Sequence, residues 1–267
     1  MTVPTRVSQQ NPSALTPLAE SIARLDAGYD IRFGPQPDDW TTCSGLLAEP
    51  SRFDLWRKDL AEWMYEQYGE SDDRATAGYV MGWYLHQPGY LAGLLFHTAR
   101  RVPSLRPRDM ALHLATEGRP HPDGVALFSD EFACLPDDPA SHHPAATVVA
   151  DEAALAALLR ARYAAHAAQF VAAFGQVARF GRRTLWAAAT DMLEYGPWAA
   201  GRACGDETGG VTDAALILPE KLAPFVAPSS LHLTDEGWKR KRNSCCFHYV
   251  LPDAEPCTAC PRTCGGS

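Results

Sequence analysis

Hydrophobic side chains recur every three or four residues over long stretches of the chain, a spacing that predicts amphipathic helices. The clearest apolar stripe lies in Ser51–Tyr68, where Ser51 is the expected N-cap. Its members are Phe53, Trp56, Leu60, Trp63 and Met64. The same spacing predicts further helices over Pro17–Ala27, Thr76–Arg101, Asp151–Gly175 and Arg182–Tyr195.

Proline, glycine and aspartate mark the expected interruptions. Pro88 lies inside the Thr76–Arg101 stretch and is predicted to break or kink that helix, because proline lacks the amide proton that the helix ladder needs. Gly196–Pro197 is predicted to close the last helix. The stretch Asp30–Pro50 is rich in Pro, Gly and Asp, and we expect it to be loop.

The middle of the chain changes from helical spacing to alternation. Met110–Ala115 and Val125–Ser129 are predicted strands, joined by the turn-rich connection Thr116–Gly124 as a hairpin. Ala146–Ala150 is a third strand candidate. The pattern therefore predicts a helix-dominated α+β fold, in which helices pack on a small, mostly antiparallel sheet, followed by a short C-terminal tail.

Composition and charge narrow the functional classes. The chain has 267 residues, 46% of them hydrophobic, and a net charge of −8, with a pI near 5.6. Such an acidic chain is a poor general nucleic-acid binder, which needs a basic face to displace counterions. The first residues carry no secretory signal pattern and no stretch is apolar enough to span a membrane, so we expect a cytoplasmic protein. Thiols stay reduced there, which favours metal binding by clustered cysteines over disulfides.

Five of the eight cysteines fall in the last residues of the chain. Cys245-Cys246 is followed, after ten residues, by Cys257-x-x-Cys260. Two residues of turn bring both sulfurs of Cys257 and Cys260 to one side, and four thiolates meet the ligand demand of a 2Fe-2S cluster, two per iron. Adjacent Cys245 and Cys246 can share that site only if the chain turns at the pair, because neighbouring side chains of a strand point to opposite faces.

Spacing alone leaves other readings open. Four cysteines also suit structural zinc, although zinc sites more often use two separated Cys-x-x-Cys knuckles. Cys264 offers an alternative ligand, and His248 is a candidate histidine ligand of the Rieske type. A disulfide, or no metal at all, is the remaining possibility.

The C-terminal spacing resembles that of the FhuF-like ferric-siderophore reductases. The residues that carry the resemblance are Arg242, Cys245, Cys246, Phe247, Tyr249, Cys257 and Cys260. The resemblance implies a 2Fe-2S cluster on the four cysteines and a fold akin to the palm region of siderophore synthetases. A weaker likeness covers Phe170–Tyr195, where Asp191 stands at a position that we expect to be Asn in the family.

The resemblance also implies a division of the chain. Residues 1–50 would form an N-terminal tail, helix and loop. Residues 51–238 would form a helical, α+β siderophore-binding domain, and residues 239–267 the cluster-binding segment.

The implied activity is one-electron reduction of Fe(III) in a siderophore, with a hydroxamate as the expected type, to release Fe(II). No nucleotide or flavin motif is evident in the sequence, so the electron would come from a ferredoxin, a flavodoxin or another reductase. Two other functions remain: a 2Fe-2S electron carrier that feeds another enzyme, and a zinc-stabilised siderophore-binding protein without redox activity.

Candidate substrate residues are basic or aromatic. Arg182, Arg183, Trp186 and Arg242 are the expected contacts to a siderophore. The basic run Lys239–Arg242 would either dock an acidic electron donor or form a solvated edge. Trp186, Trp198 and Trp238 would line a siderophore pocket or pack in the core. The dispersed Cys43, Cys134 and Cys204 are expected to be buried free thiols.

Overall fold

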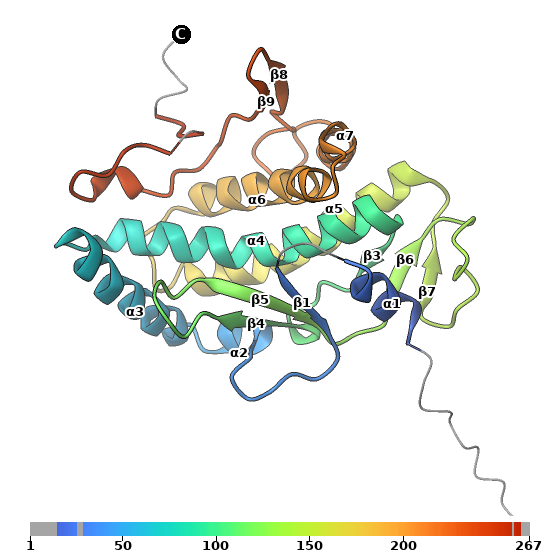
Figure 1. The fold of residues 1–267 in the computed structure, drawn as a ribbon, viewed down its shortest axis with the longest axis horizontal. Helices are drawn as coiled ribbons and strands as arrows, with labels where there is room; N and C mark the ends of the chain where they lie inside the picture. Colours follow the sequence, from blue (N-terminus) through green and yellow to red (C-terminus); the bar gives the residue numbers. More distant parts are fainter. Residues whose placement is uncertain (1–14, 26–28, 258, 263–267) are drawn as a thin grey trace, which may run out of the picture.

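The structure is a computed structural model that describes residues 15–25, 29–257 and 259–262. Helices dominate these residues (Figure 1). They are α1 Pro17–Ala23, α2 Cys43–Ala48, α3 Ser51–Tyr68, α4 Asp73–Ala99, α5 Glu152–Phe174, α6 Arg182–Ala203 and α7 Glu207–Ile217, with short 3-10 turns η1 at Pro107–Asp109 and η2 at His248–Val250.

Local sequence signals account for the ends of several helices. The bounds of α3 are those that the apolar stripe predicts, although Pro50, not Ser51, is its N-cap. Asp72 caps α4 by accepting hydrogen bonds from the backbone amides of Arg74 and Ala75, at 2.8 and 3.0 Å, and Asp151 caps α5 in the same way through Ala154. These caps satisfy amides that have no partner inside the helix.

Helices α4 and α6 each continue past their proline, so Pro88 does not break α4 and the predicted helix end at Gly196–Pro197 is wrong. The two helices cross there with backbones in direct contact. A Cβ atom on Gly93 would lie 2.5 Å from the Pro197 nitrogen, and one on Gly89 would lie 2.8 Å from the Met192 carbonyl oxygen. The close packing of α4 against α6 outweighs the backbone hydrogen bond that each helix loses at its proline.

The main sheet has four strands in the order β1-β5-β4-β2. The hairpin of β4 (Met110–Leu114) and β5 (Pro122–Leu127) is antiparallel, as the alternation predicts. β1 (Asp30–Phe33) pairs in parallel with β5, and β2 (Thr41–Thr42) pairs with β4. The loop prediction for residues 30–50 is therefore wrong: this stretch contains β1, β2 and α2. Strands this short gain their stability from the hairpin that they join, which a local pattern does not reveal.

Two smaller sheets lie outside this one. β3 (Val102–Pro103), β6 (Phe132–Cys134) and β7 (Ala146–Val148) form a second sheet, so the predicted strand at residue 146 exists but belongs to that sheet. β8 (His232–Thr234) and β9 (Gly237–Lys239) form a hairpin just before the cysteines. The fold class is the predicted helix-dominated α+β arrangement.

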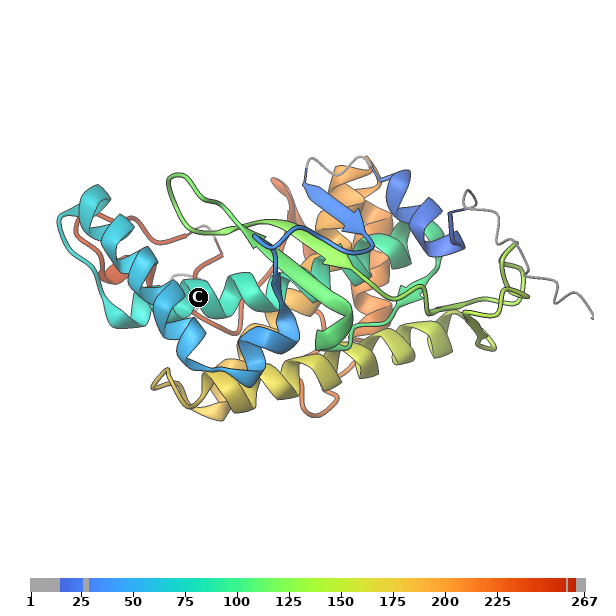
Figure 2. The same ribbon diagram turned by 90° about the horizontal axis from the view of Figure 1, so that it is seen from below.

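Helix α4 lies at the centre of the molecule. Figure 1 shows the sheet of β1, β5 and β4 on one side of α4, and α6 with the C-terminal segment on the other. Figure 2 shows α5 running along the molecule on a further side. Buried side chains from α3, α4, α5 and α6 share one core. No helix among the described residues is long and apolar enough to cross a membrane.

Candidate metal centre

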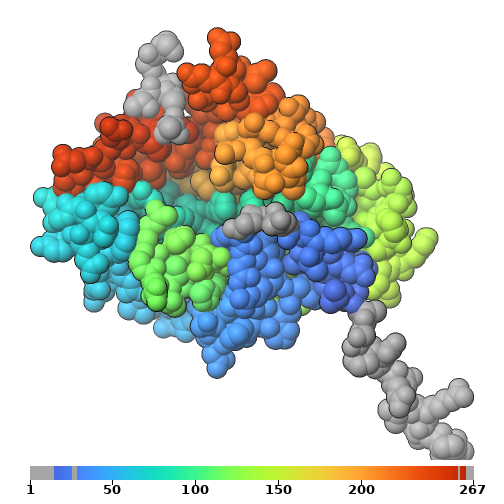
Figure 3. Space-filling view, in the orientation of Figure 1, coloured from blue at the N-terminus to red at the C-terminus, as the bar shows by residue number. Residues whose placement is uncertain are grey.

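The cysteine-bearing segment, residues 242–262, lies against helices α4 and α6 on the face opposite the main sheet (Figure 1). In the space-filling view it covers the surface above the junction of α3 and α4 (Figure 3). Cys245, Cys246 and Cys257 are half-buried, and Cys260 is buried at 2% exposure. The four cysteines therefore lie near the surface, and only Cys260 is fully shielded from bulk water.

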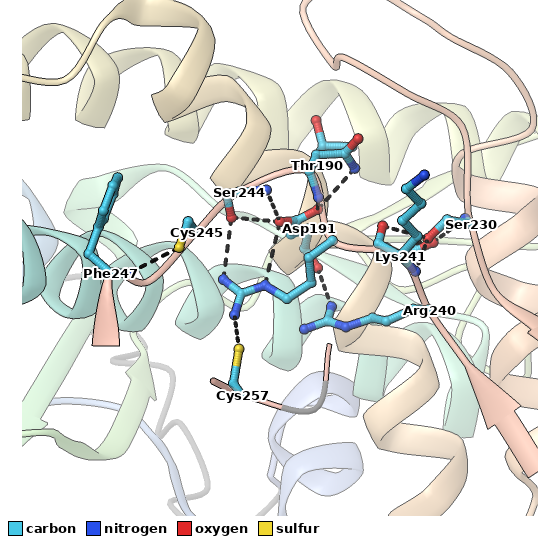
Figure 4. Close-up of polar contacts among 12 residues, drawn as sticks. Thr190, Asp191, Ser230, Arg240, Lys241, Ser244, Cys245, Phe247 and Cys257 are labelled. Carbon is cyan, nitrogen blue, oxygen red and sulfur yellow. Dashed lines mark hydrogen bonds and ion pairs between the residues drawn. The ribbon is translucent and has the colours of Figure 1, made fainter. Parts of the chain in front are cut away.

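One buried carboxylate fixes the start of this segment. Asp191 on α6 is fully buried. Its Oδ1 accepts hydrogen bonds from the backbone and side-chain nitrogens of Asn243, at 2.8 and 3.0 Å, and its Oδ2 accepts from the backbone nitrogen and hydroxyl of Ser244, at 2.8 and 2.6 Å (Figure 4). Hydrogen bonds to a charged acceptor are the strong class. Asp191 thus holds the two residues that directly precede Cys245.

Two more polar side chains of α6 hold the chain that leads to this segment. Thr190 Oγ1 accepts a hydrogen bond from the Val226 amide at 3.1 Å. Glu194 accepts from the hydroxyls of Ser229 and Ser230, at 3.0 and 3.3 Å, and also from the Ser230 amide. Burial raises the pKa of Glu194, an effect that these hydrogen bonds oppose. Polar side chains of α6 therefore bind the chain at several points between residues 226 and 244.

Helix α4 meets the cysteines through a glycine. A Cβ atom on Gly78 would lie 2.6 Å from the carbonyl oxygen of Cys246 and 3.1 Å from the ring of Phe247. Contact this close leaves room for no side chain on α4 at that position. The backbone of Cys246 can therefore rest directly on the helix.

Local turns bring the cysteines together. The Cys260 amide donates to the Cys257 carbonyl at 2.9 Å, which closes the turn of the Cys-x-x-Cys step. Phe247 has a positive φ of 60°, so the chain turns directly after the vicinal pair, and its amide donates to Cys245 Sγ at 3.3 Å. Phe247 itself stacks on Phe180, with ring centroids 5.2 Å apart.

The thiols also interact with one another. A hydrogen bond joins Cys257 to Cys246, and burial together with the nearby Cys246 raises the pKa of Cys257 to about 11. Burial likewise raises the pKa of Cys245, with Cys246 and Cys260 adding to the effect. The raised pKa values favour protonated Cys245 and Cys257 in the absence of metal, and metal binding would release those protons.

Arg242 supplies positive charge beside the thiols. Its guanidinium lies 3.9 Å from Cys257 Sγ and 3.7 Å from Asp191 (Figure 4). Burial alone would lower the pKa of Arg242, but Asp191 and the thiols of Cys246, Cys257 and Cys245 raise it. The arginine therefore stays charged and stabilises negative charge on the neighbouring sulfur atoms.

The basic run that contains Arg242 has two sides. Arg240 points inward and donates to the Asp191 carbonyl at 2.8 Å, whereas the side chains of Lys239 and Lys241 are exposed. The arginines of this run therefore contact residues of the site and its lysines face solvent, and docking of an acidic electron donor stays a prediction.

The remaining sequence candidates lie elsewhere or have other partners. Arg182 and Trp186 line a separate cavity of about 470 Å³ with residues of α5, Arg183 is exposed, and Trp186 is almost fully buried against Phe225. His248 Nδ1 lies 2.9 Å from the Tyr79 hydroxyl.

The dispersed cysteines follow the expectation only in part. Cys43 and Cys134 are buried, but Cys204 is exposed, because α6 ends there and the chain turns at the surface. Cys264 lies outside the described residues.

The donor set fits an iron–sulfur cluster. Among the described residues, no three His, Cys, Asp or Glu side chains lie close enough together to hold a single metal ion. A dinuclear cluster has a different requirement, since each of its two irons takes two cysteine thiolates. Cys246 and Cys260 each interact with both Cys245 and Cys257, so four thiols are available for two irons. The Phe247 amide and the half-buried Arg242 add contacts that stabilise charge on sulfur.

Comparison with known families agrees with this chemistry. Residues 242–262 match the family model described as the FhuF 2Fe-2S C-terminal domain. The cofactor of this segment is therefore a 2Fe-2S cluster. The FhuF-like match covers only the C-terminal segment and contains four cysteines, Cys245, Cys246, Cys257 and Cys260. A search of curated proteins found no match.

Sequence reasoning missed most of the residues that support the FhuF-like segment. Thr190 and Glu194 carried no signal beyond being polar in an otherwise apolar part of α6, and Gly78 carried none. Asp191 stood out only because we expect Asn there in the family. Its partners are about fifty residues further along the chain, and only the folded structure reveals them.

Proposed function

We propose that the protein is a ferric-siderophore reductase, which adds one electron to Fe(III) in a siderophore and so releases Fe(II). The observation that carries this proposal is the grouping of the cysteine thiols at the surface of a large helical body, with Arg242 next to three of them, Cys245, Cys246 and Cys257. Residues 51–238, far more than a cluster needs for its own binding, would form the siderophore-binding domain.

Cys245, Cys246, Cys257 and Cys260 are the proposed ligands, two thiolates for each iron. When bound, the cluster supplies one electron, which reduces the siderophore's Fe(III) to Fe(II) while the cluster returns to its oxidised state. Fe(III) is a hard ion that suits anionic oxygen donors, and Fe(II) is held far less tightly by them. A ferredoxin, a flavodoxin or another reductase would restore the electron.

The chain's own residues would tune and protect this centre. Arg242 places a positive charge next to Cys257, and the Phe247 amide donates to Cys245. Both interactions stabilise negative charge on sulfur, and such contacts set cluster potentials. Asp191 and Gly78 would fix the segment so that this geometry is kept when the electron arrives.

A turnover assay tests the proposal. Protein that is reduced without oxygen is mixed with a ferric trihydroxamate, a ferrous-selective chelator and an electron-donor system whose terminal reductant is in excess over the iron. We expect continuous formation of the ferrous chelate, and none with a Cys257→Ser variant. A wild-type rate equal to that of the Cys257→Ser variant would refute the reductase and leave the electron-carrier function.

A further inference from the structure

A large cavity shares a wall with the proposed cluster site. It has a volume of about 950 Å³ and lies between the end of α6, the start of α7, the β8–β9 hairpin and the C-terminal segment. The residues that matter for the argument are Tyr195, Trp198, Arg202, Lys239, Arg240 and Lys241. This volume is in the range of natural small-molecule sites.

Two lining residues connect the cavity to the thiols. Ala259 lies between Cys257 and Cys260 in the sequence and forms part of the cavity wall. Arg240 lines the cavity, and Arg242, two residues further on, contacts Cys257. A molecule in this cavity would therefore lie beside the cluster-binding turn, and electron transfer requires such closeness because it falls steeply with distance.

Aromatic rings and guanidinium groups form the floor of the cavity. The rings of Tyr195 and Trp198 meet edge to face, with centroids 6.0 Å apart. Arg240 lies over the Tyr195 ring at 4.7 Å, and Arg202 lies over the Trp198 ring at 5.4 Å. These contacts hold the cations over flat apolar surfaces, an arrangement that suits oxygen-rich ligands with apolar linkers.

The cavity is positive within an acidic chain. Four of its lining side chains are cationic and two are carboxylates, whereas the whole chain has a net charge of −8. Both carboxylates are already engaged: Glu236 pairs with Lys239 at 3.1 Å, and Glu207 accepts a hydrogen bond from Trp198 at 2.9 Å. The surplus of positive charge favours a ligand with an electronegative surface.

We propose that this cavity binds the ferric siderophore, and that it selects complexes of Fe(III) with oxygen donors whose net charge is neutral or negative. The inference rests on the proposed function and adds the location and the charge preference of the substrate. The cavity beside Arg182 and Trp186 is lined by residues of α5, of α6 and of the turn that joins them, and by none of the cluster segment.

Binding can be measured apart from electron transfer. Gallium(III) has the charge of Fe(III) but is not reduced under these conditions, so its complexes report binding alone. The probes are the gallium complexes of a linear trihydroxamate with a free terminal amine and of its N-succinylated derivative, which have the same metal site and opposite net charge. Titration calorimetry with the cluster-loaded wild-type protein should show at least fivefold tighter binding of the succinylated complex.

A second experiment reverses the charge of two side chains on the cavity wall and measures binding again. Arg202→Glu combined with Lys241→Glu changes two exposed side chains and should weaken binding of the succinylated complex at least tenfold. Arg24→Glu combined with Lys58→Glu changes the net charge equally at exposed positions away from the cavity. This control should bind like the wild type, because its cavity is unchanged.

The failures are distinguishable. Equal binding by the cavity variant and the control would overturn the inference, and so would loss of binding in Arg182→Glu/Arg183→Glu alone. In either case, turnover with ferric trihydroxamate would still support the reductase. A wild type that binds neither gallium complex also overturns the inference. Absence of turnover in the wild type would refute the reductase itself.

Discussion

The carboxylate of Asp191 holds Ser244 through two hydrogen bonds, from its amide at 2.8 Å and from its hydroxyl at 2.6 Å. Ser244 directly precedes the first cysteine of the metal centre. A buried side chain of α6 therefore sets where the cluster segment begins.

Asp191→Ala should weaken both the fold and the centre. The substitution leaves the amide of the buried Ser244 and the amides of Asn243 without their acceptor, and Arg242 without its carboxylate, which together cost about 3 kcal/mol or more. We expect a lower melting temperature and several-fold faster loss of visible absorbance under a chelator. The exposed Asp137→Ala is the control. Wild-type cluster lifetime in Asp191→Ala would contradict this role.

Gly78→Ala tests the contact between α4 and the vicinal cysteines. The new methyl group would lie 2.6 Å from the Cys246 carbonyl, so the segment must move away from the helix. Gly82→Ala is a matched control one turn further along α4, where nothing lies within 4 Å of the new Cβ. We expect an altered paramagnetic resonance spectrum of the reduced cluster only in Gly78→Ala. Identical spectra for the two variants would show that this contact is unimportant.

Serine substitutions test the proposed ligand set. Replacement of Cys245, Cys246, Cys257 or Cys260 should each remove most of the visible absorbance and of the acid-labile sulfide, because serine is a poor ligand for iron in such clusters. Cys204→Ser, at an exposed cysteine outside the segment, should retain both. Bleaching by Cys264→Ser together with an intact cluster in Cys260→Ser would assign the fourth ligand to Cys264.

His166 predicts how stability depends on pH. Burial lowers its pKa to about 4, from an ordinary value near 6.5, and the neutral ring bridges the Leu105 carbonyl and the Tyr84 hydroxyl. The unfolded chain therefore binds a proton between pH 6.5 and 4 that the native state does not. Stability contributed above pH 6.5 is lost as the pH falls through this window, by roughly 3 kcal/mol at pH 4.

His166→Gln removes that titration and keeps a polar side chain in place. Melting curves between pH 7 and pH 4 should show a shallower fall for the variant than for the wild type. Some slope should remain, since burial also lowers the pKa of His86 to about 4. Parallel curves for the two proteins would contradict this contribution of His166.

The sequence predicted elements whose signals are local. The apolar stripe of α3 and the alternation of β4 are properties of contiguous residues, and both elements form where expected. β1 and α2 were missed because Asp30–Ala48 is held by pairing with β5 and by packing, which a local pattern does not encode. The helices continue past Pro88 and Pro197 for the same reason: close contacts between α4 and α6 stabilise both helices there.

The candidate site divides in the same way. The cysteines were evident because their spacing is a sequence property. Contact of Arg242 with the substrate stays a prediction, and the structure adds its contacts with Cys257 and Asp191. Its contact with Asp191 joins the C-terminal segment to helix α6, so no local spacing could have revealed it.

A single-turnover titration tests the central claim most directly. Protein whose cluster has been reduced by one electron, freed of reductant under anaerobic conditions, is mixed with an excess of ferric trihydroxamate and a ferrous-selective chelator. The account predicts that the cluster's oxidised spectrum returns while one Fe(II) is trapped for each cluster. A cluster that stays reduced, or Fe(II) trapped without cluster oxidation, would contradict it.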